Sequence, residues 1–158
     1  MRQVLFVCTG NIFRSLTAEY ALRDVLGPRR DIVIASAGTE DYPYVVSPLV
    51  REYLLARGLD VSGHRRRTLT VGMLTEATSV IAMSTEHRAV LAQAFDRPDI
   101  PLFTEACGIA AEALPDVEEA VSDYRTNPAA VEAHVRATID RIIELTPQLA
   151  RWLESCSW

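Results

Sequence analysis

The stretch that decides the fold is residues 4–15, which read Val-Leu-Phe-Val-Cys-Thr-Gly-Asn-Ile-Phe-Arg-Ser. Its first four residues form a continuous apolar run, which is typical of a central parallel strand buried on both faces. Apolar residues then recur at helical spacing from Ala18 to Leu26, and Gly27-Pro28 ends that pattern. The stretch therefore predicts a buried strand, a short loop and an amphipathic helix.

Further strands and helices alternate along the rest of the chain. Strands are predicted at Ile32–Ala35 and Ser79–Met83, with a weaker one at Ile100–Phe103. Helices are predicted from Pro48 to Gly58, from about Glu86 to Ala94, and from Pro128 onward with a break or restart at Thr146-Pro147. This alternation favours one α/β domain over residues 1–158. We expect a three-layer sandwich with a central four-stranded parallel sheet and helices on both faces.

The composition excludes several classes of function. The chain has 158 residues and a net charge of −5, so the basic face of a nucleic-acid binder is not expected. All 16 basic residues are Arg, which excludes mechanisms that need a Lys. No stretch approaches the length of a membrane span, so no membrane partner is expected. The protein is predicted to be a monomer or weak dimer.

The three cysteines, at positions 8, 107 and 156, are odd in number and widely spaced. They do not resemble a disulfide framework, and no Cys/His cluster has the spacing of a metal site. We therefore predict no metal, no cofactor and a reducing, cytoplasmic location.

Residues 8–15 carry the predicted chemistry. Cys8 and Arg14 bracket a short loop between the strand and the helix, and the carboxyl edge of a parallel sheet is where ligands bind. Backbone N–H groups in such a turn can converge on one anion, and the helix adds its positive end. Gly10 allows close approach, and Asn11 tolerates a left-handed conformation. Arg14 can grip two phosphate oxygens through its planar fork.

The same loop would activate Cys8. Helix N-termini and nearby cations favour the thiolate, which is the nucleophilic form of a cysteine. The Arg14 guanidinium and the Ser15 hydroxyl both act in that direction. One loop can therefore bind a phosphate dianion and supply the atom that attacks it.

Residues 4–19 closely resemble the low-molecular-weight protein tyrosine phosphatase family. Further likeness lies in Ser36-Ala37-Gly38-Thr39, in Gly58-Leu59-Asp60, in His64-Arg65-Arg66-Arg67, in Ile81-Ala82-Met83 and in Leu114-Pro115-Asp116. The resemblance covers nearly the whole chain. It implies hydrolysis of phosphotyrosine, on a protein or as a small aryl phosphate, through a phosphocysteine intermediate.

The resemblance also implies roles for individual residues. Cys8 would be the nucleophile and Arg14 the phosphate clamp. The phosphate loop would comprise Thr9, Gly10, Asn11, Ile12, Phe13 and Ser15. Ser36 and His64 would support Asn11 in its unusual conformation. Tyr42 would stack on the substrate ring beside the pocket, and Tyr44 is an alternative for that place.

The general acid has two candidates. A phenoxide leaving group needs a proton, so a carboxyl group must lie near the leaving oxygen. Asp116 follows Pro115 and matches the position of the family's acid. Asp123 precedes Tyr124, which also resembles the family's acid loop. We favour Asp116, although Val117 departs from the usual Asp-Pro pair.

Besides Val117, three further positions depart from the family pattern. Phe13 stands where most members have a second loop cysteine, so Cys8 would lack an internal partner against overoxidation. Leu16 replaces the usual Pro, and Ser84 replaces a common Asp. Two alternatives stay open: an arsenate reductase of the same fold, although Cys107 and Cys156 lack the expected spacing, and a catalytically weak phosphate-binding module.

Overall fold

The computed structural model describes residues 1–41 and 43–156. Its strands are β1 (Arg2–Cys8), β2 (Ile32–Gly38) and β3 (Ser79–Ala82). Its helices are α1 (Arg14–Leu26), α2 (Pro48–Ala56), α3 (Val71–Glu76), α4 (Thr85–Phe95), α5 (Phe103–Ala106), α6 (Val117–Ala120) and α7 (Pro128–Ser155). None of the described helices is both long and apolar enough to cross a membrane.

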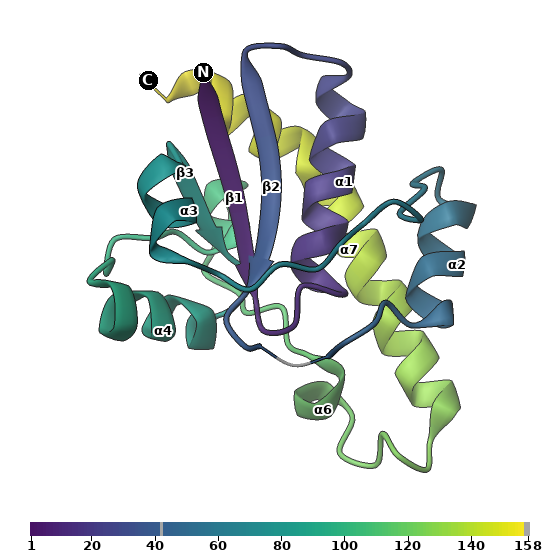
Figure 1. Ribbon diagram of the computed structural model, residues 1–158. Coiled ribbons are helices and arrows are strands. Elements are labelled where there is room, and N and C mark those ends of the chain that lie inside the picture. The colour runs from purple at the N-terminus through teal and green to yellow at the C-terminus, as the bar shows by residue number, and fades with distance from the viewer. Residues whose placement is uncertain (42, 157–158) are drawn as a thin grey trace.

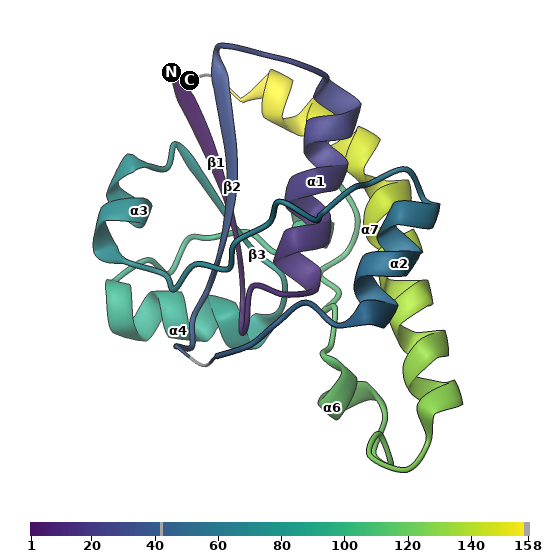
Figure 2. The same cartoon turned by 45° about the vertical axis from the view of Figure 1, so that its right-hand side comes forward.

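The strands form a parallel sheet in the order β2-β1-β3, with β1 in the centre (Figure 1). Alternate residues of β1 point to opposite faces. Val4 and Phe6 pack with residues of α1 and α7 on one face, whereas Leu5 and Val7 pack with residues of α3 and α4 on the other. The three predicted layers are present, and the second view shows α1 and α7 together on one side of the sheet and α3 and α4 on the other (Figure 2).

The expected four-stranded sheet is wrong for the described residues, where the sheet has three strands. The predicted fourth strand contributes a single parallel bridge, between Leu102 and Ala82. The Ala82 N–H donates to the Pro101 carbonyl over 3.0 Å. Pro101 has no backbone N–H that could donate to β3, so the ladder cannot extend through it. The chain then turns into α5 at Phe103.

The expected break near Thr146-Pro147 is also wrong, because α7 is continuous from Pro128 to Ser155 with Pro147 inside it. Side chains on both sides of Pro147 are buried against the rest of the domain, including Leu145 and Leu149. Packing of this apolar face stabilises the helix beyond what the missing backbone hydrogen bond costs.

The carboxyl ends of the strands meet at the end of the sheet away from the N-terminus (Figure 1). The loop between β1 and α1 lies there, and α6 lies beyond it on the same side. Residues 104–127, which show no regular pattern in the sequence, contain most of α5, all of α6 and their connections. This end of the molecule therefore gathers the loops that can build a site.

Candidate active site

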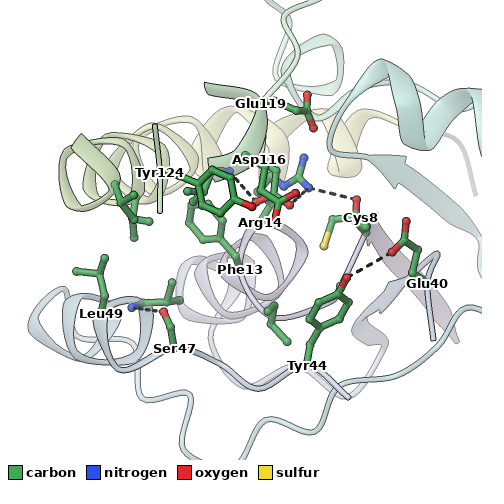
Figure 3. Close-up of a pocket in the computed structure, with 18 of the residues that line it drawn as sticks. Cys8, Phe13, Arg14, Glu40, Tyr44, Ser47, Leu49, Asp116, Glu119 and Tyr124 are labelled. Carbon is green, nitrogen blue, oxygen red and sulfur yellow. Dashed lines mark hydrogen bonds and ion pairs between the residues drawn. The ribbon is translucent and has the colours of Figure 1, made fainter. Parts of the chain in front are cut away.

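A pocket of about 530 Å³ opens over the loop between β1 and α1. Cys8 is the last residue of β1 and Arg14 is the first of α1, so the strand and the helix fix the two ends of the loop. Cys8, Arg14 and Asp116 all line this pocket, and Figure 3 shows the three side chains close together. Both Cys8 and Arg14 are buried, with 2% and 1% of their surface exposed.

Asn11 holds the loop in shape. Its φ of 56° lies in the left-handed region, as the sequence predicts for this position. Its side-chain amide donates to the hydroxyls of Ser15 and Ser36 over 3.0 and 2.7 Å. Its side-chain oxygen accepts from the Arg67 N–H over 2.9 Å. Every polar atom of this buried side chain is thus paired, which locks an otherwise unfavourable backbone conformation.

His64 completes the support of Asn11. Its Nε2 lies 2.9 Å from the Asn11 carbonyl, to which it donates. Burial is the main cause that lowers the pKa of His64, and the neutral ring still carries the proton this bond needs. The structure therefore brings Ser36 and His64 together at Asn11.

Glu19 is a further supporting residue, for which the sequence predicts no role. It is buried, and it accepts a hydrogen bond from the Ser36 hydroxyl. Arg23 and Arg67 pair with it over 2.5 and 3.6 Å. A buried carboxylate is tolerated only with such partners. Arg23 lies four residues after Glu19 on the same helix, and this spacing is the feature of the sequence that could have indicated their ion pair.

Gly38 lets β2 end directly against the loop. A Cβ atom at this position would lie 2.5 Å from the Thr9 carbonyl oxygen and 3.1 Å from the Asn11 nitrogen. No side chain fits in that space, so the strand can pass this close to the loop backbone only with glycine.

The sulfur of Cys8 lies among hydrogen-bond donors. The Asn11 N–H points to it over 3.3 Å, and the Ser15 hydroxyl lies 2.9 Å away. The Ser15 oxygen already accepts from the Asn11 amide, so its own proton is free to point to the sulfur. The Cys8 sulfur therefore contacts a backbone donor from the loop and a hydroxyl from the first turn of α1.

Arg14 faces the pocket with one edge of its guanidinium. Nη1 donates to the Leu114 carbonyl over 3.0 Å, which anchors the far edge. Nη2 donates to the Asp116 carboxylate over 3.1 Å and more weakly to the Thr9 hydroxyl over 3.4 Å. The guanidinium is therefore held in a fixed plane at the base of the pocket.

The two candidate acids lie in different surroundings. Asp116 is the residue before α6, where one carboxylate oxygen accepts from the Val117 N–H over 2.8 Å and the other faces Arg14. Asp123 is exposed, accepts from the Asn127 side chain over 3.0 Å, and is not among the residues that line the pocket. Of the two candidate acids, Asp116 is the one that lines the pocket together with Cys8 and Arg14.

Aromatic side chains form part of the pocket wall. Tyr44 and Tyr124 lie on different sides of the opening (Figure 3), and the Tyr44 hydroxyl donates to Glu40 over 3.4 Å. Phe13 lines the pocket and is largely buried. Tyr42 lies outside the described residues, so Tyr44 is the described aromatic residue on that loop that reaches the pocket.

Two histidines without a predicted role contact the site. His134 of α7 packs edge-on against the Phe13 ring, with centroids 6.4 Å apart, and its Nε2 lies 3.0 Å from the Pro115 carbonyl. His87 of α4 lies 2.8 Å from the Thr9 hydroxyl. Both reach the site from distant parts of the sequence, where no local pattern signals them.

Four further carboxylates line the pocket, from Glu40, Glu86, Glu118 and Glu119. Among residues 1–41 and 43–156, no three His, Cys, Asp or Glu side chains are arranged to hold a metal ion. The arrangement supports anion binding by the loop and nucleophilic attack by the Cys8 sulfur.

Comparison with known proteins agrees with this geometry. A protein of Ralstonia solanacearum named probable low molecular weight protein-tyrosine-phosphatase EpsP is 33% identical over 84 residues, which cover 52% of this chain and 56% of that protein. The match thus spans little more than half of that relative. The protein-arginine-phosphatase of Bacillus subtilis is 28% identical over 108 residues, covering 64% of this chain and 68% of that protein.

Solved structures match over almost the full length. A YwlE mutant from Bacillus subtilis superposes with a TM-score of 0.80 at 25% identity, covering 98% of this chain and 100% of that one. The low molecular weight protein tyrosine phosphatase from T. tengcongensis has a TM-score of 0.73 at 28% identity, covering 96% and 99%. The family described as low molecular weight phosphotyrosine protein phosphatase matches residues 3–155. The chain therefore belongs to the low molecular weight phosphotyrosine protein phosphatase family.

Proposed function

We propose that the protein hydrolyses phosphotyrosine and related aryl phosphate monoesters, with Cys8 as nucleophile, Arg14 as phosphate clamp and Asp116 as general acid and base. The observation that carries the proposal is the meeting of these three side chains in one pocket, over a loop whose Asn11 N–H donates to the Cys8 sulfur. Phosphoproteins are the substrate class that the family name implies.

In the first step, the phosphate dianion binds in the loop and Arg14 holds its oxygens. The Cys8 thiolate attacks phosphorus, a sulfur–phosphorus bond forms, and the bond to the aryl oxygen breaks. Asp116 gives its proton to the departing oxygen, so a phenol leaves instead of a phenoxide.

In the second step, the same carboxylate takes a proton from water. The resulting nucleophile attacks phosphorus, the sulfur–phosphorus bond breaks, and the Cys8 thiolate is restored with inorganic phosphate as product. Through both steps, the loop donors and Arg14 stabilise charge on the oxygens of the transferring group.

Asp116 and a bound phosphate would share one donor of Arg14. The Asp116 carboxylate pairs with Nη2 of Arg14 over 3.1 Å. A bound phosphate would take over that donor, which would release the carboxylate from Arg14.

The central test is turnover of p-nitrophenyl phosphate without added metal. The wild-type protein should hydrolyse it, and Cys8→Ser should abolish turnover while retaining phosphate binding. Turnover that survives the Cys8→Ser change would overturn the proposed mechanism. Turnover by the wild-type protein also distinguishes an enzyme from a phosphate-binding module, which would bind phosphate without turnover.

Phosphoarginine is a second candidate substrate, because the Bacillus relative is named a protein-arginine-phosphatase and YwlE structures match over the full chain. The pocket walls of this chain favour an aryl group, since Ile12, Phe13, Tyr44 and Tyr124 present apolar and aromatic surface. Competition between a phosphotyrosine peptide and a phosphoarginine peptide decides between them. A higher kcat/KM for phosphoarginine would reject the aryl assignment.

Arsenate reduction has less support from this site. Cys107 is buried, and burial raises the pKa of its thiol to about 12. Neither Cys107 nor Cys156 is among the described residues that line the pocket. A relay of thiolates from Cys8 is therefore not favoured, and an arsenate reduction assay with thioredoxin should give no turnover.

A further inference from the structure

A buried histidine outside the proposed machinery lies directly behind the phosphate loop. His87, in the first turn of α4, is 1% exposed, and both of its ring nitrogens have partners. Nε2 lies 2.8 Å from the Thr9 hydroxyl, and Nδ1 lies 2.9 Å from the Ser84 hydroxyl. The Thr9 oxygen in turn lies 3.4 Å from Nη2 of Arg14.

The donors in this chain can be ordered from the Arg14 end. A guanidinium only donates, so the Thr9 oxygen accepts from Arg14. The Thr9 hydroxyl proton can then go to His87 Nε2, which must be the unprotonated nitrogen. Nδ1 carries the ring proton and donates to Ser84. The order is Arg14 to Thr9, Thr9 to His87, and His87 to Ser84.

The charge of the surroundings agrees with a neutral ring. Burial, followed by the positive charge of Arg14, lowers the pKa of His87 to about 3. A protonated ring would place a second donor on the Thr9 oxygen and a cation beside Arg14. Both effects would oppose the hydrogen bond from Arg14.

We propose that His87 is a positioning residue for Arg14, which acts through the Thr9 hydroxyl by fixing its oxygen as an acceptor for Nη2. The inference rests on the proposed role of Arg14 as the phosphate clamp. The Leu114 carbonyl anchors one edge of the guanidinium, and the Thr9 hydroxyl orients the other. Without His87 the Thr9 hydroxyl could rotate its proton toward Arg14 and lose this function.

The test compares His87→Leu, His87→Gln and Thr9→Val, alone and with the double variant His87→Leu/Thr9→Val. Gln can offer a carbonyl oxygen near the place of Nε2, whereas Leu cannot. Phosphate affinity is measured by calorimetry, and kcat and KM are measured with p-nitrophenyl phosphate. We expect His87→Leu and Thr9→Val each to weaken phosphate binding and kcat/KM by about tenfold, as for loss of one hydrogen bond to a charged group.

The double variant should lose no more phosphate affinity than the more impaired of the two single variants, because both changes break the same series of hydrogen bonds. His87→Gln should recover most of the loss. Losses that multiply to about a hundredfold, or equal losses for Gln and Leu, would show a packing role only and reject the proposal. If His87→Leu does not fold, Thr9→Val against Thr9→Ser tests the same link, and equal phosphate affinity in the two rejects it.

A spectroscopic measurement adds an independent readout. Long-range ¹H–¹⁵N spectra of the wild-type protein near neutral pH should show His87 as the tautomer protonated on Nδ1. A ring protonated on Nε2 would overturn the assigned order of donors. Failure of the proposed function would look different, since it removes turnover from the wild type but leaves the calorimetric and spectroscopic comparisons intact.

Discussion

Arg14 and Asp116 form an ion pair across the mouth of the phosphate loop, with Nη2 3.1 Å from the carboxylate oxygen. The Arg14 side chain is 2% exposed, whereas that of Asp116 is 38% exposed. The cation is therefore fixed at the base of the pocket, and the anion reaches it from the more accessible side. A phosphate group in the loop would compete with Asp116 for the same donor.

This competition predicts that removing the charge of Asp116 strengthens product binding. In Asp116→Asn, inorganic phosphate no longer displaces a carboxylate from Arg14 and no longer meets a negative charge nearby. We expect the dissociation constant for phosphate to fall by about threefold to tenfold, a modest effect because Asp116 is partly exposed. Calorimetric titration measures it, and weaker binding by the variant would show that Asp116 does not compete with phosphate.

The same variant should lose catalysis in a way that depends on the leaving group. Phenyl phosphate releases a poor leaving group, so Asp116→Asn should lower its kcat by about a hundredfold or more. For a substrate whose leaving group needs no proton, the same change should lower the rate of the first step far less. Burst kinetics separate the two steps.

Asp123→Asn is the matched control for that experiment. It removes a carboxylate beyond the other end of α6, one that is exposed and bonded to Asn127 instead of Arg14. It should leave kcat for both substrates within about twofold of the wild-type value. If Asp123→Asn instead shows the dependence on leaving group, the acid is Asp123 and the proposed mechanism needs that change.

The phosphate loop was predictable because its determinants are contiguous in the sequence. The apolar run before Cys8, the left-handed Asn11 and the helix that begins at Arg14 all follow from local preferences, and the structure has each of them. Contacts between distant segments can be predicted only where the family resemblance implies them, as for Ser36 and His64 with Asn11.

The rest of the site depends on contacts that local patterns do not encode. His87 and His134 lie on helices and reach the loop only through the packing of α4 and α7. The fourth strand was overpredicted because apolar composition does not reveal that Pro101 stops the ladder. Pro147 was read as a helix break because propensity does not include the burial that stabilises α7 around it.

The contact of Gly38 with the loop predicts a sharp effect of one methyl group. In Gly38→Ala the new Cβ would lie 2.5 Å from the Thr9 carbonyl oxygen, so β2 or the loop must shift. We expect a loss of about 1–3 kcal/mol in the free energy of unfolding, as for overpacking of a core, together with weaker phosphate binding. Gly63→Ala is the control, because a Cβ there meets nothing within 4 Å. Equal stability of the two variants in urea would contradict the prediction.

The buried neutral His87 predicts how stability depends on pH. Its folded pKa of about 3 lies below the usual value of 6.5, so the unfolded chain binds its proton first as the pH falls. Its contribution to stability is complete above about pH 6.5 and decreases from there toward pH 3. The loss is at most about 1.4 kcal/mol per pH unit for one proton. In His87→Gln this part of the slope should be absent, while the carboxylates shared by both proteins give the same background. Urea unfolding at several pH values measures the difference, and parallel curves would contradict it.

Phe13 predicts that oxidation of Cys8 is poorly reversible. The resemblance implies that a second loop cysteine protects the nucleophile by forming a disulfide, and here that position holds a buried phenyl ring. Peroxide should carry Cys8 past the sulfenic acid to the sulfinic acid, which dithiothreitol does not reduce. Activity after peroxide and then dithiothreitol should therefore stay low in wild type.

Phe13→Cys should restore recovery of activity, and Phe13→Ala separates the effect of the new thiol from loss of the ring that packs against His134. Mass spectrometry of the Cys8 peptide should show sulfinic acid in wild type and Phe13→Ala, and a disulfide between positions 8 and 13 in Phe13→Cys. Full recovery of wild-type activity would mean that Cys8 is protected by another route. Cys107 is a poor candidate for that route, because burial raises the pKa of its thiol to about 12. A sulfenic acid on Cys8 that persists until dithiothreitol reduces it would then explain the recovery.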